Sequence, residues 1–211
     1  AFVRKQGAAT RYCFSSASSF GEVLEPIVNV ARRCGRTDAT QVLMLGDGGN
    51  GLMEAGLRAF PDAQFILDRM HLRQHLGEVA EFLKIDPALR PAWVDEVDRR
   101  IGRGEVAEVI ADLKQHIPAR RRGQTPPADR VTPFIEYLTR FATCVNYDDY
   151  QARGWPIGSG EVESLHRQGP QPRLKLPGAS WNRDSLNAMA GLRAGRLSGQ
   201  WEEYWRTRDA A

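Results

Sequence analysis

The sequence lacks the features of disulfide-rich, membrane-spanning and exported proteins. Its three cysteines, Cys13, Cys34 and Cys144, lie far apart and form no C-x-x-C pair, which argues against a disulfide framework or a thiolate zinc site. The chain has no run of about 18 apolar residues and no export signal at its start. We therefore predict a protein of the reducing cytoplasm that has no membrane partner.

A strong net charge is also lacking. The chain has 29 Lys+Arg against 26 Asp+Glu, a formal charge of +3, which is too small to indicate a nucleic-acid partner. Nearly all the basic residues are arginines, which bind phosphate bidentately, although a GC-rich genome would give the same bias. With 211 residues, 42% of them hydrophobic, the chain can bury the core of one domain, with or without an insertion.

Short apolar runs near the start predict an α/β arrangement. Residues 9–15 fit a short strand, and an amphipathic helix follows, capped by Ser18 or Ser19 and interrupted by Pro26. Residues 41–46 and 63–67 are typical of strands buried on both faces, and a tight turn and a helix lie between them. Strand, helix and strand in this order indicate a βαβ unit in a partly parallel sheet.

The chain changes character after Asp68. Residues 69–147 predict several helices and no strand, with a basic, proline-containing loop at 119–130. A second loop region is predicted at 146–160, followed by helices that begin near Glu161 and Trp181. We thus predict a partial α/β core over 1–69, a helical insertion over 70–150, and a return helix with basic C-terminal helices over 151–211.

Two acids stand at the carboxyl ends of the predicted strands, where open α/β sheets bind their ligands. Asp47 follows the first strand and Asp68 the second, and burying an unpaired carboxylate at either place would be very costly. Asp47 is therefore a candidate metal ligand. The alternative is that its side chain only accepts the N–H two residues further on and opens the turn.

The segment from Asp68 onward has a second possible chemistry. If a helix starts at Asp68, then Asp68, His71 and His75 lie along one face, with Glu78 one turn further. Such a set could hold a transition metal. The alternative is a capping aspartate followed by histidines that bond to backbone or carboxylates.

A third group of polar residues follows a glycine-rich stretch. Gly158-Ser159-Gly160 precedes Glu161 and Glu163, which are two apart and so point to different faces of a helix. Acids in a first helical turn are favoured by the helix dipole alone. At most one of the two glutamates is therefore expected to face a site shared with Asp47.

Together these segments resemble bacterial DDE insertion-sequence transposases with GDGA, D-x-x-H and GSG-x-V-E motifs. The matching residues, in the order of that family, are Gly46-Asp47-Gly48, Asp68-x-x-His71 and Gly158-Ser159-Gly160-x-Val162-Glu163. The tail is similar as well, with a basic stretch at 173–179, the following Trp181, and Gly199-Gln200-Trp201. The sequence departs from the pattern at Gly49, where the family has alanine, and at Gly51-Leu52, where it often has Trp-Ile.

The resemblance implies an RNase H-like mixed sheet, N-terminally truncated, with a long helical insertion and C-terminal helices. In this family three acids hold two Mg²⁺ or Mn²⁺ ions for DNA strand cleavage and transfer. Asp47 matches the second catalytic, metal-binding acid and Glu163 the third, while Asp68 and His71 match a supporting motif. No acid before Asp47 fits the first position, so we expect a transposase fragment that is inactive alone.

The resemblance also implies DNA partners, namely transposon ends and target, in the bacterial cytoplasm at the nucleoid. The candidate phosphate contacts are Arg167, Arg173, Lys175 and Arg183. Trp181 either stacks on an unpaired base or anchors the last helices to the core. Assembly into a homo-oligomer is left open. The alternative functions are a non-enzymatic DNA-binding or regulatory remnant, and a helical metal-binding protein that uses Asp68, His71 and His75.

Overall fold

A computed structural model describes residues 2–8, 12–15, 20–49, 51–117 and 129–209 of the chain. The chain forms two compact units. The first unit comprises residues 1–42, 54–63 and 159–211, and the second comprises 43–53 and 64–158. The division predicted from the sequence, into residues 1–69, 70–150 and 151–211, stays a prediction.

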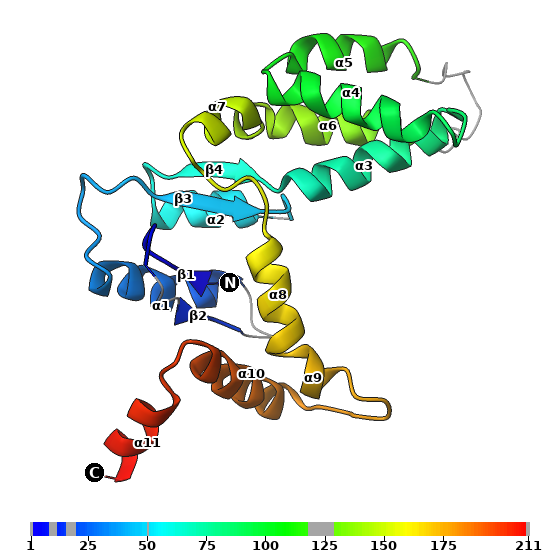
Figure 1. Ribbon diagram of the computed structural model, residues 1–211. Coiled ribbons are helices and arrows are strands. Elements are labelled where there is room, and N and C mark those ends of the chain that lie inside the picture. The colour runs from blue at the N-terminus through cyan, green and yellow to red at the C-terminus, as the bar shows by residue number, and fades with distance from the viewer. Residues whose placement is uncertain (1, 9–11, 16–19, 50, 118–128, 210–211) are drawn as a thin grey trace. The chain divides into compact units, whose positions relative to one another are not determined.

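The second unit contains a small parallel sheet. Strand β3 (Leu43–Gly46) pairs with β4 (Gln64–Leu67), with Leu43 opposite Gln64 (Figure 1). Helix α2 (Leu52–Ala59) separates them in sequence, so the predicted strand, helix and parallel strand are confirmed. The prediction that both strands are buried on both faces is wrong for β3, because its first three residues are only half-buried, whereas Phe65 to Leu67 of β4 are buried.

Helices make up the rest of the second unit, as predicted for residues 69–147, and no strand occurs in the described part of that range. They are α3 (Arg69–Phe82), α4 (Arg90–Gly102), α5 (Val106–Lys114), α6 (Val131–Arg140), the 3₁₀ turn η1 (Ala142–Cys144) and α7 (Tyr147–Ala152). In Figure 1, α3, α4, α5 and α6 pack together as one helical layer. Their shared core includes Leu72, Leu76, Ile101, Leu138 and Phe141, all of which are fully buried.

Helix α7 falls inside residues 146–160, for which the sequence predicted a loop. That prediction is wrong for the first residues, because Tyr147 and Tyr150 are buried against the helical layer and fix a helical turn there. Tyrosines beside two aspartates give no clear helical periodicity, so this helix depends on packing that the local sequence does not reveal.

The first unit joins segments from both ends of the chain. Its two short strands, β1 (Phe2–Val3) and β2 (Tyr12–Cys13), are antiparallel. Its helices are α1 (Phe20–Arg33), most of α2, α8 (Gly160–Gln168), α9 (Gln171–Leu174), α10 (Arg183–Leu197) and α11 (Trp201–Asp209). A small core of Cys13, Leu165 and Ala194, covered by Leu197, holds β2, α8 and α10 together.

Most of the predicted elements of the first unit are present. Helix α1 runs through Pro26. The predicted capping residues Ser18 and Ser19 and the start of the predicted strand at 9–15 lie outside the described residues. In the second unit, most of the predicted loop at 119–130 lies outside them as well. Among the described residues, the cysteines form no disulfide. None of the described helices is long and apolar enough to cross a membrane.

Candidate functional site

Asp47 lies at the carboxyl end of β3, as predicted, and its side chain is exposed. Its Oδ1 accepts the N–H of Gly49 at 2.9 Å, so the turn-opening role is present. Within the described chain, no cation pairs with this carboxylate. The backbone carbonyl of Asp47 accepts the hydroxyl of Tyr137 at 3.0 Å, so the backbone is tied down while the side chain faces solvent.

Asp68 has a different environment from Asp47. It is the N-cap of α3, its side chain is 1% exposed, and its Oδ1 accepts the N–H groups of Met70 at 2.7 Å and His71 at 3.0 Å. The helix begins at Arg69, so the assumption that it starts at Asp68, from which the metal-binding face was predicted, is wrong. The geometry corresponds to the capping alternative, which typically stabilises a helix by about 1 kcal/mol.

The two histidines of α3 serve different contacts. Nδ1 of His71 lies 3.3 Å from Asp68 Oδ1, at ion-pair distance but without hydrogen-bond geometry. The ring of His75 meets that of Tyr137 edge-on at 5.0 Å, and its Nδ1 is 3.8 Å from Glu78. Across the described ranges, no group of three or more His, Cys, Asp or Glu side chains is placed to hold a metal ion.

Two backbone hydrogen bonds connect segments of the three motifs. The N–H of Asp68 donates to the carbonyl of Gly46 at 2.8 Å, next to Asp47. The N–H of Arg69 donates to the carbonyl of Ile157 at 3.0 Å, in the segment that leads into Gly158-Ser159-Gly160. Residues that are far apart in sequence therefore meet at the carboxyl edge of the parallel sheet.

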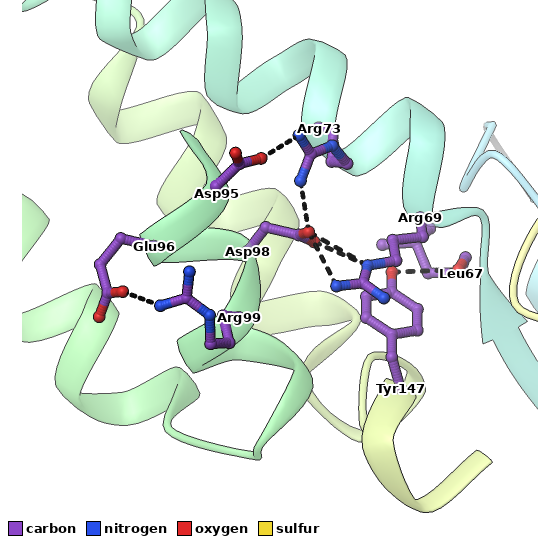
Figure 2. Close-up of polar contacts among 8 residues, drawn as sticks. All are labelled: Leu67, Arg69, Arg73, Asp95, Glu96, Asp98, Arg99 and Tyr147. Carbon is purple, nitrogen blue, oxygen red and sulfur yellow. Dashed lines mark hydrogen bonds and ion pairs between the residues drawn. The ribbon is translucent and has the colours of Figure 1, made fainter. Parts of the chain in front are cut away.

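A network of arginines fixes the start of α3 against α4, and Figure 2 shows Arg69 and Arg73 converging on Asp98. Arg69 Nε lies 3.1 Å from each oxygen of Asp98, and Arg73 Nη1 lies 2.6 Å from Oδ2. The Asp98 side chain is only 1% exposed, so the two guanidinium groups compensate its burial. Arg69 also lies over the ring of Tyr147, whose hydroxyl donates to the carbonyl of Leu67 at 3.1 Å.

Sequence reasoning missed this network, although one signal was available. Asp98 shares a helical face with Val94 and Ile101, both of which are buried. An acid on an apolar face requires a buried cationic partner, and Arg69 and Arg73 lie four apart on the preceding helix. The pattern could have predicted the ion pairs, but not that they adjoin Asp68.

The two glutamates of α8, in the first unit, differ in their surroundings. Glu161 pairs with Arg4 at 2.8 Å, whereas Glu163 is exposed and has no ion-pair partner among the described residues. Asp47 belongs to the second unit, so its pairing with Glu163 stays a prediction.

Residues 164–183 form a segment without any acidic residue, called here the basic segment. Its cations, Arg167, Arg173, Lys175 and Arg183, are all exposed, and none has an ion-pair partner in the part of the chain that is described. Trp181 is half-buried, and its indole N–H has no hydrogen-bond partner among the described residues. The arginines beside Asp98 are thus paired with an acid, whereas those of the basic segment have no ion-pair partner among the described residues.

Comparison with protein-family models, curated proteins and solved structures gives no match to the chain.

Proposed function

We propose that this chain is part of a DDE-type insertion-sequence transposase, built on an RNase H-like mixed sheet, that binds DNA and divalent metal. The observation that supports this best is the pair of backbone hydrogen bonds that joins the Asp47, Asp68 and Ile157 segments at one sheet edge. These segments carry or adjoin the three motifs of the resemblance. The carboxyl edge of a parallel sheet is also where α/β proteins bind their ligands.

The two proposed ligands have the chemistry that a hard divalent cation prefers. Asp47 and Glu163 are exposed carboxylates without ion-pair partners in the described chain, and Mg²⁺ and Mn²⁺ prefer such oxygen ligands. We propose that Asp47 and Glu163 are metal ligands, as the resemblance implies, and that Asp68 and His71 have a supporting role at the start of α3. When bound, the metal would stabilise charge on the oxygens of a DNA phosphate. The role of Asp68 is to hold α3 in place, because its Oδ1 is already used by two amides.

DNA binding is assigned to the basic segment. Four exposed cations with no acid between them would attract the phosphate backbone, and each is free to form a new contact. This assignment also serves the second candidate function, a non-enzymatic DNA-binding or regulatory protein. The same unpaired cations favour that candidate, and it requires no metal.

The DNA assignment is tested by the salt dependence of affinity for a labelled duplex. Four phosphate contacts should lower the affinity roughly 100-fold as the salt rises from about 50 to about 200 mM. Replacing Arg167, Arg173, Lys175 and Arg183 by glutamine should then reduce the slope of log affinity against log salt by about 0.9 per lost contact.

A matched control changes the same number of exposed cations elsewhere. Lys84, Arg103, Lys114 and Arg130 lie in the second unit, outside the basic segment, and are also exposed. Their replacement by glutamine should leave most of the slope intact. If both quadruple variants lower the slope equally, the binding reflects the overall charge of the chain and not the basic segment. A DNA affinity that does not change with salt would overturn the assignment.

A further inference from the structure

The position of the Asp47 backbone depends on helix α6 as well as on the sheet. The Tyr137 hydroxyl donates to the Asp47 carbonyl at 3.0 Å, and this contact joins residues far apart in the chain. The Asp47 side chain takes no part in it, and within the described residues its Oδ1 accepts only the local amide of Gly49. The arrangement therefore fixes the main chain and leaves the carboxylate exposed.

Gly48 shows how closely α6 approaches this turn. It is buried with φ of +78°, and a Cβ at this position would lie 2.8 Å from the Phe141 ring and 3.0 Å from the Tyr137 ring. Any side chain here would displace these aromatic rings or change the backbone. The glycine after Asp47 thus lets two aromatic side chains of the helical layer reach the turn.

Tyr137 is itself held in a fixed orientation. Its ring packs against Phe141 at 5.1 Å and meets the edge of His75 at 5.0 Å. These ring contacts hold the Tyr137 hydroxyl in place as a donor to the Asp47 carbonyl.

We propose that Tyr137 is a positioning residue for Asp47, acting through the backbone carbonyl and the ring contact with Gly48. This rests on the proposed function of Asp47 as a metal ligand. On this proposal the helical layer helps to hold Asp47 in place, because Tyr137 belongs to α6 and its neighbour His75 to α3. His75 then acts as an aromatic support for Tyr137.

The test compares Tyr137→Phe with Tyr150→Phe by amide hydrogen exchange, followed residue by residue by NMR. Tyr150 is a buried tyrosine of the same unit whose hydroxyl donates to Thr143 at 2.9 Å, away from Asp47. Tyr137→Phe keeps the ring and removes one hydrogen bond, so the amides of Gly49 and Leu52 should exchange roughly fivefold faster. Tyr150→Phe should leave those two amides unchanged. Unchanged exchange in Tyr137→Phe, or the same increase in both variants, would overturn the proposal.

A second measurement on the same samples separates this inference from the proposed function. Mn²⁺ bound at Asp47 should broaden the NMR signals of residues 46–49, and Asp47→Asn should remove the effect. If wild type shows no broadening, the metal assignment fails, while the exchange comparison still decides the role of Tyr137. If wild type is broadened, Tyr137→Phe should need several-fold more Mn²⁺ to reach the same broadening, and Tyr150→Phe should not. Equal Mn²⁺ requirements in wild type and Tyr137→Phe would contradict a positioning role.

Discussion

At the scale of single residues, the two acids that bind Arg73 provide a sharp comparison. Asp98 is 1% exposed and also binds Arg69, whereas the Asp95 side chain is 55% exposed. Asp98→Asn keeps the size of the side chain but leaves the guanidinium groups without their buried counter-charge. We expect it to lower the free energy of unfolding by about 3 kcal/mol, as measured by urea denaturation.

Asp95→Asn is the control for this change. It removes an exposed partner of the same arginine, so the free energy of unfolding should fall by less than about 1 kcal/mol. Similar losses from the two variants would show that the buried position of Asp98 is not what matters. The start of α3, next to Asp68, would then be held by other contacts.

At the scale of elements, Arg193 of α10 connects two helices of the first unit. Its guanidinium donates to the carbonyls of Gln168 and Gly169, at the C-terminal end of α8. A cation at that end satisfies carbonyls that have no partner within the helix and complements the helix dipole. Arg193→Ala should therefore lower the free energy of unfolding by about 1–2 kcal/mol, as measured by urea denaturation.

The comparison for Arg193 is Arg196, which lies on the same helix and is exposed. Arg196→Ala should change the stability by less than about 0.5 kcal/mol, as is usual for surface positions. An equal effect of both substitutions would mean that α8 does not depend on the contact from α10.

The elements that the sequence predicted correctly are those with strong local patterns. Apolar runs between turn residues located β3 and β4, and helical spacing of apolar residues located α1. Helix α7 was missed because its buried residues are tyrosines fixed by long-range packing. The shallower burial of β3 was missed because an apolar run does not reveal which residues will cover it.

At the scale of the whole molecule, the position of Asp47 and Asp68 at strand ends was predictable, but the difference between them was not. The same rule placed both acids, yet one is exposed and the other caps a helix. The contacts around the two acids come from distant parts of the chain: Tyr137 bonds to the Asp47 carbonyl, and Asp98 and Ile157 bond to Arg69, next to Asp68. Such contacts follow from the three-dimensional arrangement, which motif spacing does not contain.

The last prediction concerns what the chain does to DNA. Asp47 and Glu163 match two of the three metal-binding acids of the resemblance, and Asp68 is engaged by amides of its own helix. In-line displacement at phosphate needs metal on both the attacking and the leaving oxygen, and two carboxylates provide too few ligands for that. We therefore expect these 211 residues to bind a supercoiled plasmid without nicking it in Mg²⁺ or Mn²⁺.

Asp47→Asn and Asp62→Asn make this result informative, since both aspartates are exposed. Each substitution removes one negative charge, so each should preserve DNA binding or strengthen it slightly. If the wild-type chain nicks the plasmid, and only Asp47→Asn abolishes the nicking, the chain already contains a working metal site. The third ligand would then have to come from a side chain other than Asp47 and Glu163, and Asp68 would be the first to test because its N–H donates to the carbonyl of Gly46, next to Asp47.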